Sequence, residues 1–144
     1  MTPPTRLYLF EIFEKVEAAS TRKDKVAVLQ QNNCLAVRDV LKGAFDDSIQ
    51  FLIPTGNPPY TPADERTGKP LHKYTKRFRY FAQGGPGERI QSYRREKMFI
   101  EMLEMLHPKE VTIVTAMKDK KFAGLYKGLT KKIVQEAFPK LIVS

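Results

Sequence analysis

The stretch of residues 54–70 constrains the fold more than any other feature, because it holds five prolines and two glycines in 17 residues. Proline lacks a backbone N–H and glycine breaks local structure, so no continuous helix can cross this stretch. On both sides of it, apolar residues recur at the three- and four-residue spacing of amphipathic helices. We find no convincing strand alternation and no internal repeat. We therefore expect an all-α fold in which residues 54–70 form a loop, either ordered or flexible.

About seven helices follow from this periodicity. They are predicted at residues 5–18, 22–31, 34–46, 71–83, 88–107, 108–121 and 130–138. Pro108 should lie in the first turn of its helix, and Thr130 should be the N-cap of the last one. The run Gly84-Gly85-Pro86-Gly87 predicts a turn, and the apolar run 50–53 predicts a fragment packed on the core. A length of 144 residues fits one domain, so we expect a single compact helical domain over residues 1–144.

The charge is unevenly distributed. The chain has 25 Lys and Arg against 16 Asp and Glu, a net charge of +9. Residues 66–97 hold ten basic and two acidic side chains, a net charge of +8, and residues 109–132 hold seven and two, a net charge of +5. Clustered cations of this kind indicate a polyanionic partner, with a solvated basic face as the alternative.

Two groups of candidate phosphate-binding residues follow. In the predicted helix 71–83, the aromatic residues Tyr74, Phe78 and Phe81 should face the core and the cations should face phosphates. The candidates of this first group are Lys73, Lys76, Arg77, Arg79, Arg94 and Arg95. In the second group, a glycine turn precedes the start of the last helix, where free amides and the helix dipole favour an anion. Its candidates are Lys120, Lys121, Lys127, Gly128, Thr130, Lys131 and Lys132; the alternative is an ordinary capped helix with solvated lysines.

Signatures of enzyme chemistry are missing from the sequence. His72 and His107 have no cysteine or carboxylate at ligand spacing, so we expect no metal site. No glycine-rich loop is followed by Lys and Ser or Thr, so we expect no phosphate-cradling loop and no cofactor. Cys34, the single cysteine, has no basic residue close to it in sequence and is interpreted as a reduced, half-buried thiol that packs as a small hydrophobe.

The sequence also predicts a soluble intracellular protein. No apolar run approaches the roughly 18–20 residues of a membrane span. The first six residues lack the charged and apolar regions of a signal peptide.

Three segments carry a further signal: Ile12 to Leu29 with its Ser20-Thr21-Arg22-Lys23 turn, the pair Val40 to Phe45 and Gln50 to Ile53, and the chain end with Asp119, Gly128, Thr130 and Phe138-Pro139-Lys140-Leu141. In their order and spacing they resemble the helical DNA-binding domain of ATP-dependent DNA ligases of the T-even phage type. The resemblance implies a fold that grips duplex DNA across the minor groove through helix starts and loops. It transfers that role to Arg22, Lys23, Gly128, Thr130, Lys131 and Lys132.

The sequence departs from those ligases in ways that bear on function. The spacing from Asp119 to Gly128 is longer than in the family, and residues 54–97 are not aligned with it. The ligase nucleophile motif Lys-x-Asp-Gly is absent from the sequence, as are the nucleotidyltransferase and OB domains. The whole chain also looks like an uncharacterised family of small tailed-phage proteins. We therefore expect a free-standing, non-enzymatic protein of a tailed phage that binds double-stranded DNA in the host cytoplasm.

The alternative hypothesis is a protein-interaction module or a virion component. Such a module would dock on a phage or host protein of replication or transcription. It is suggested by the apolar tail Leu141-Ile142-Val143 and by the proline-rich residues 54–62. The tail could instead pack on the core of its own chain.

Overall fold

The computed structural model describes residues 7–143, and within them the regular structure is helical apart from two isolated β-bridges. The six α-helices are α1 (Leu9–Ala18), α2 (Arg22–Gln31), α3 (Leu35–Phe45), α4 (Ser92–Met105), α5 (Pro108–Lys118) and α6 (Lys131–Ala137). The four 3-10 helices are η1 (Leu71–Lys73), η2 (Thr75–Tyr80), η3 (Pro86–Arg89) and η4 (Phe122–Gly124). The all-α prediction is confirmed. Residues 5 and 6 of the first predicted helix lie outside the described residues.

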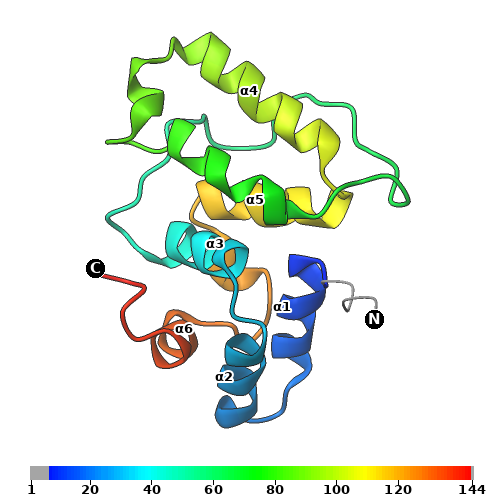
Figure 1. The fold of residues 1–144 in the computed structure, drawn as a ribbon, viewed down its shortest axis with the longest axis vertical. Coiled ribbons are helices and arrows are strands. Elements are labelled where there is room, and N and C mark those ends of the chain that lie inside the picture. Colours follow the sequence, from blue (N-terminus) through cyan, green and yellow to red (C-terminus); the bar gives the residue numbers. More distant parts are fainter. Residues whose placement is uncertain (1–6, 144) are drawn as a thin grey trace, which may run out of the picture.

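The helices share one core (Figure 1). In the figure, α3 and α5 cross the middle of the molecule, with α1, α2 and α6 below them and α4 with η1–η3 above. Phe122 of η4 joins the lower and middle parts. Its ring packs edge-on against Phe13 of α1 and Phe45 of α3, with centroids 5.4 and 5.6 Å apart. The described residues therefore form a single compact domain.

The segment predicted as an α-helix at residues 71–83 is folded instead as the 3-10 helices η1 and η2. A 3-10 helix has three residues per turn, so residues three apart lie on the same side. Leu71 and Tyr74 form one such buried pair, and Phe78 and Phe81 form another. The aromatic residues of this segment and its one β-branched residue, Thr75, are weaker α-helix formers than Ala, Leu or Lys. The prediction that the aromatic side chains face the core is confirmed.

The predicted helix at residues 88–107 is divided into η3 and α4. Arg95 of α4 is buried, and its Nη1 donates hydrogen bonds to the carbonyls of Gly87 and Ile90 at 3.0 and 2.9 Å. Ile90 is extended, with φ −87° and ψ 136°. The guanidinium therefore holds η3 against the start of α4 and occupies carbonyls that a continuous helix would have used.

The proline- and glycine-rich loop at residues 54–70 is ordered. The buried ammonium of Lys118, at the end of α5, donates hydrogen bonds to the carbonyls of Pro54 and Gly56 at 2.9 and 2.8 Å. At the other end of the loop, the Lys69 N–H donates to the carbonyl of Met105 at 2.8 Å. Both ends of the loop are thus fastened to the α4–α5 pair.

The tail packs on the core of its own chain. Ile142 is buried, the Lys42 ammonium donates to the carbonyl of Leu141 at 2.8 Å, and the Val143 N–H donates to Asp46 at 3.1 Å. This agrees with the alternative that the apolar tail packs on the core of its own chain and does not dock on a partner.

The carboxylate of Glu110 organises the centre of the fold. Glu110 lies in the first turn of α5 and is fully buried. Its Oε1 accepts hydrogen bonds from the N–H groups of Leu9 and Leu71 at 3.0 and 3.1 Å, and its Oε2 accepts one from Phe10 at 3.1 Å. Leu9 and Phe10 begin α1, which has no Ser, Thr, Asp or Asn at its N-cap, and Leu71 begins η1. One side chain therefore satisfies the free amides of two other elements.

Burial raises the pKa of Glu110 above its ordinary value, and the three N–H donors lower it, which offsets part of that rise. The dipole of α5 acts in the same direction as the donors, because Glu110 lies at the positive end of that helix.

We predict that Glu110→Ala lowers the free energy of unfolding by about 3 kcal/mol, because it leaves three buried amides without an acceptor. Glu110→Gln should lower the free energy of unfolding less, since its amide oxygen can still accept hydrogen bonds from the N–H groups of Leu9 and Leu71. Urea unfolding followed by circular dichroism measures both effects. Glu65→Ala, at an exposed position of the loop, is the control. A Glu110→Ala variant as stable as this control would show that water satisfies the three amides.

Candidate nucleic-acid interface

The starts of α2 and α6 lie side by side, although about 110 residues separate them in the sequence. Each start carries a threonine cap. The Thr21 hydroxyl accepts from the Asp24 N–H at 3.1 Å, and the Thr130 hydroxyl accepts from the Ile133 N–H at 3.4 Å. Between them is a hollow of about 280 Å³, lined by Arg22, Lys25, Gly128, Thr130, Lys132 and Ile133. The structure thus brings together two of the segments that the sequence singled out.

Gly128 is required at the rim of this hollow for two reasons. Its φ is +84°, a conformation that side chains of L-amino acids rarely adopt. A Cβ atom at this position would also lie 2.9 Å from Cε and 3.0 Å from Nζ of Lys25. The glycine therefore lets the loop before α6 approach α2 closely.

Lys25 joins this loop to α1. Its ammonium donates to the carbonyls of Val16 and Ala19 at 2.8 and 2.7 Å, and so caps the C-terminal end of α1. The Lys127 N–H donates to the carboxylate of Glu17 at 2.7 Å. The hollow is thus lined by the start of α2 and by residues 128–133, and both of these segments are tied to the end of α1.

The cations around the hollow differ in how freely they can meet a phosphate. Arg22 forms an ion pair with Glu136 of α6. Lys23, Lys127, Lys131 and Lys132 form no ion pair with any residue between 7 and 143. All of them except the half-buried Lys131 are exposed. We define the α2–α6 surface as Arg22, Lys23, Lys127, Gly128, Thr130, Lys131 and Lys132.

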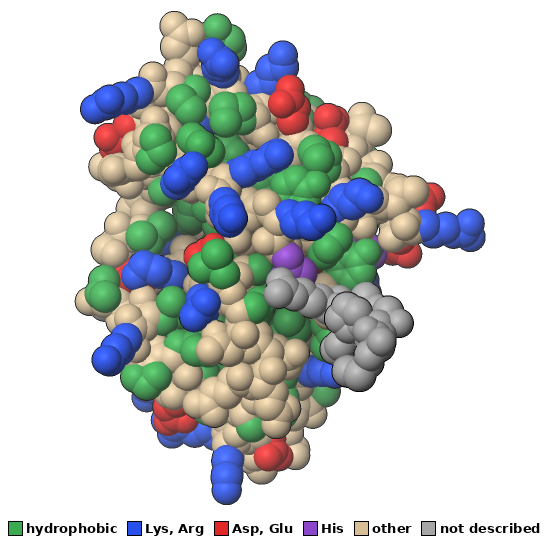
Figure 2. Space-filling view, viewed as in Figure 1, with side chains coloured by type: hydrophobic (Ala, Val, Ile, Leu, Met, Phe, Trp, Pro, Cys, Tyr) green, Lys and Arg blue, Asp and Glu red, His purple; other side chains and the backbone are tan. Residues whose placement is uncertain are grey.

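A second basic surface lies over η2 and α4. Lys73, Lys76, Arg77, Arg79 and Arg94 are all exposed there. Two of these cations rest on aromatic rings: the guanidinium of Arg77 lies 5.0 Å from the centroid of Tyr74, and that of Arg79 lies 5.0 Å from the centroid of Tyr80. Figure 2 shows Lys and Arg side chains spread over the upper half of this face. The aromatic rings hold the cations on the surface without neutralising them.

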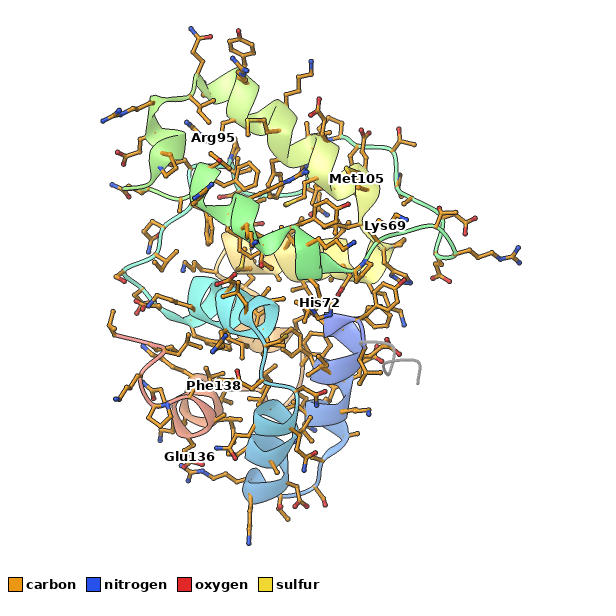
Figure 3. All side chains as sticks on the ribbon, viewed as in Figure 1. Lys69, His72, Arg95, Met105, Glu136 and Phe138 are labelled. Carbon is orange, nitrogen blue, oxygen red and sulfur yellow. The ribbon has the colours of Figure 1, made fainter. Side chains whose placement is uncertain are left out.

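The structure corrects two of the candidate residues. Arg95 is buried against the main chain of η3 and is not available to a phosphate in solution (Figure 3). Lys120 adopts a φ of 58°, and its ammonium donates to the carbonyls of Gly43 and Asp46 at 2.5 and 3.1 Å. Lys120 therefore caps the end of α3. Lys121 remains exposed. Sequence alone does not distinguish a cation that caps a helix from one that is solvated.

Sequence reasoning missed the pairing of Cys34 with His72, because the two are 38 residues apart. Cys34 is the N-cap residue of α3, and its sulfur lies 4.0 Å from Nδ1 of His72. Nε2 of His72 lies 2.8 Å from the carbonyl of Leu7, so that nitrogen carries the proton and Nδ1 faces the thiol. Burial raises the pKa of the Cys34 thiol, but the hydrogen bonds from His72 and from the start of α3 outweigh it, and the net shift is downward.

We predict that Cys34 reacts with iodoacetamide at lower pH than an ordinary cysteine, because the thiolate is the reactive form and its pKa is lowered. The pKa of His72 is raised, chiefly by its hydrogen bond with Cys34, so a protonated imidazole beside the thiolate is favoured. His72→Phe should move the alkylation profile to higher pH, since burial then acts without the imidazole. Mass spectrometry across a pH series measures this, and Cys34→Ser is the unreactive control. Identical profiles for the wild type and His72→Phe would contradict the prediction.

His107 acts as a cap, because its Nδ1 accepts a hydrogen bond from the Lys109 N–H at 3.0 Å at the start of α5. Over residues 7–143, no group of three or more His, Cys, Asp or Glu side chains is placed to hold a metal ion. In the same part of the chain, no helix has the length and apolar character needed to span a bilayer.

Residues 12–124 match the model of a family of unknown function, DUF6433. The chain belongs to this family. The matched residues include α2 and the η2–α4 surface, and they end before Gly128. No curated protein matches the chain. The family description names no activity, so the resemblance to ligase DNA-binding domains and the phage origin remain predictions.

Proposed function

We propose that this protein binds double-stranded DNA through the phosphate backbone, and that the α2–α6 surface makes the main contacts. The observation that carries the proposal is the meeting of two capped helix starts at one hollow. Four lysines on these helix starts and on the loop before α6 lack an ion-pair partner among residues 7–143, and one of them, Lys132, lines the hollow. Free amides at helix starts and unpaired cations are the groups that bind phosphate oxygens. Contacts of this kind do not read base sequence.

The η2–α4 surface would add a second set of phosphate contacts. Its five exposed cations belong to the segment of net charge +8. Such charge attracts DNA over a distance of about a Debye length and raises the association rate. The ligase resemblance assigns DNA contact to residues of both α2 and the start of α6, and the closeness of these two helices supports the same role.

The proposal is for a binding protein without catalytic activity, made in the cytoplasm of a phage-infected cell. The absence of Lys-x-Asp-Gly from the sequence supports the first part, because no lysine is placed in that motif to accept AMP. The ligase-like segments support the second part, which is the origin of the protein in a phage-infected cell. The alternative of a protein-interaction module has less support, since the tail, one of the two features that suggested it, is occupied by contacts with Lys42 of α3 and with Asp46.

We predict that the binding constant falls linearly with salt on logarithmic axes, by roughly 0.9 per phosphate neutralised. Lys131→Ala/Lys132→Ala should flatten this slope by about one to two units and weaken all sequences alike. The helix should survive, because alanine is a good helix former and Thr130 still caps it. Fluorescence anisotropy with duplexes of several sequences, at a series of salt concentrations, measures both quantities.

The matched control is Arg66→Ala/Lys69→Ala, which removes the same charge from the exposed loop. Lys69 lies well apart from Glu136 and Phe138 of the α6 region (Figure 3). This control should change the slope much less. A folded Lys131→Ala/Lys132→Ala variant with wild-type affinity and slope would exclude the α2–α6 surface as the DNA contact.

A further inference from the structure

A pocket of about 540 Å³ lies between α3 and η2, away from the α2–α6 hollow. Its volume falls in the range of about 300–1,000 Å³ that is usual for small-molecule sites. Three parts of the chain form its walls: α3, residues 49–51 and residues 75–85. The last two of these walls are fixed to each other, because the N–H of Leu52 donates to the carbonyl of Phe81 and the N–H of Gln83 donates to that of Gln50, both at 2.7 Å.

The floor of the pocket is apolar and partly aromatic. Ile49, Phe51, Phe78 and Ala82 line it, together with the backbone of Gly43, Gly84 and Gly85. Phe51 and Phe78 are phenyl rings that a flat ring can contact face to face or edge to face. A planar, weakly polar ligand therefore suits this floor better than a strongly hydrated one.

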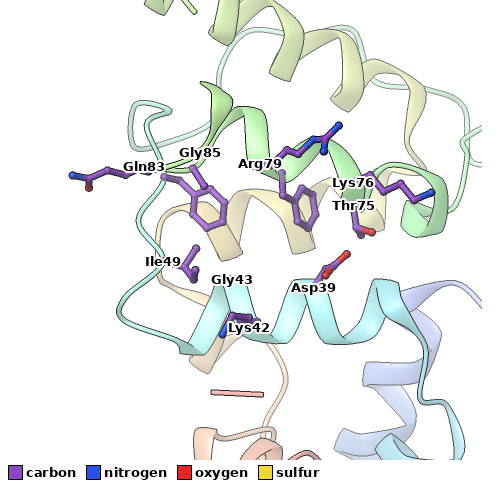
Figure 4. A pocket seen from close by; sticks show the side chains of 13 residues that line it. Asp39, Lys42, Gly43, Ile49, Thr75, Lys76, Arg79, Gln83 and Gly85 are labelled. Carbon is purple, nitrogen blue, oxygen red and sulfur yellow. The ribbon is translucent and has the colours of Figure 1, made fainter. Parts of the chain in front are cut away.

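Two polar groups meet at one end of the pocket. Asp39 projects from α3 toward Thr75 on η2 (Figure 4). Thr75 is only 3% exposed, and its hydroxyl has no hydrogen-bond partner in the described part of the chain. Burial raises the pKa of Asp39, while the Thr75 hydroxyl and the charge of Arg38 lower it, which agrees with the hydroxyl lying beside the carboxyl. Burying a hydroxyl without a hydrogen-bond partner costs free energy unless a ligand supplies that partner.

The pair offers one hydrogen-bond acceptor beside one hydrogen-bond donor. The Asp39 carboxylate can accept from an amino group, and the Thr75 hydroxyl can donate to a ring nitrogen. An amino group next to a ring nitrogen is the edge that adenine and cytosine present. Lys76 and Arg79 are exposed on the η2 wall of the same pocket, where they would attract a phosphate (Figure 4). Lys42 contributes its stem alone, since its ammonium is bound to Asp46 and to the carbonyl of Leu141.

We propose that this pocket binds a nucleotide whose base carries an amino group beside a ring nitrogen, with the base on the phenyl rings and its amino edge at Asp39 and Thr75. The nucleotide is either free or an unpaired residue of a DNA strand. The site does not depend on the α2–α6 surface, so either this proposal or the proposed DNA contacts can be wrong without affecting the other.

The test is a titration with AMP, followed by NMR chemical shifts or calorimetry. Two ligands serve as controls: purine riboside 5′-monophosphate, which lacks the amino group, and ribose 5-phosphate, which lacks the base. AMP should bind saturably and about tenfold more tightly than either control, since a site that hydrogen-bonds a polar group rejects ligands without it. Equal binding of AMP and ribose 5-phosphate, or no saturable binding of AMP and of the DNA probe below, would overturn the proposal.

Variants of the two polar groups complete the test. Asp39→Asn and Thr75→Val should each weaken AMP binding by about tenfold, whereas Glu65→Gln at an exposed position should leave it unchanged. Thr75→Val is nearly isosteric and removes a hydroxyl without a partner, so it should not lower stability in urea. Unchanged AMP binding in both Asp39→Asn and Thr75→Val would refute the assigned site.

The source of the nucleotide is distinguished with DNA. A duplex with one unpaired adenine is compared with the fully paired duplex. A preference for the unpaired adenine that Asp39→Asn abolishes would support a DNA residue as ligand, and AMP binding without such a preference would support a free nucleotide. Lys131→Ala/Lys132→Ala should weaken both duplexes alike and leave AMP binding intact, which separates failure of this proposal from failure of the DNA surface.

Discussion

The fold depends on one buried carboxylate. Glu110 accepts hydrogen bonds from the first residues of α1 and of η1, and it does so from the first turn of the central helix α5. Burying a charge is unfavourable unless hydrogen bonds and dipoles compensate for it, and here three amides and the α5 dipole compensate for part of that cost. The position of α1 then fixes where its C-terminal end meets Lys25, and through Lys25 the place of Gly128 beside α2.

The parts of the fold that depend on local sequence could be predicted. The bounds of α2 agree with those predicted from the Thr21 cap and the apolar spacing that follows it. Pro108 and Thr130 occupy the first turn and the cap that the sequence indicated. The 71–83 segment was predicted wrongly as an α-helix, because three-residue and four-residue spacings of aromatic residues look alike over so short a stretch. The division at Ile90 was missed because it depends on the internal contacts of Arg95.

The two segments of the candidate site could be predicted from the sequence, but which of their cations are free to bind a phosphate could not. The turn at Arg22 and the glycine turn at Gly128 were identified from charge, caps and resemblance, and the structure places them together. Which cations are free depended on tertiary contacts: Lys120 and Lys25 both end as caps of helices, and Arg22 is paired with Glu136. The Asp39–Thr75 pocket and the Cys34–His72 pair left no sequence signal, since each joins α3 to residues beyond the proline-rich loop.

The role of Glu110 also affects the order in which a new chain can fold. The amide of Leu9 and its acceptor are 101 residues apart, so on the ribosome α1 emerges long before the group that caps it. The same applies to η1, because the acceptor of its first amide lies 39 residues further along the chain. Helices shorter than about 12–15 residues are marginal in isolation, and α1 has ten. The amino-terminal half should therefore remain fluctuating during synthesis and become fixed only when α5 leaves the exit tunnel.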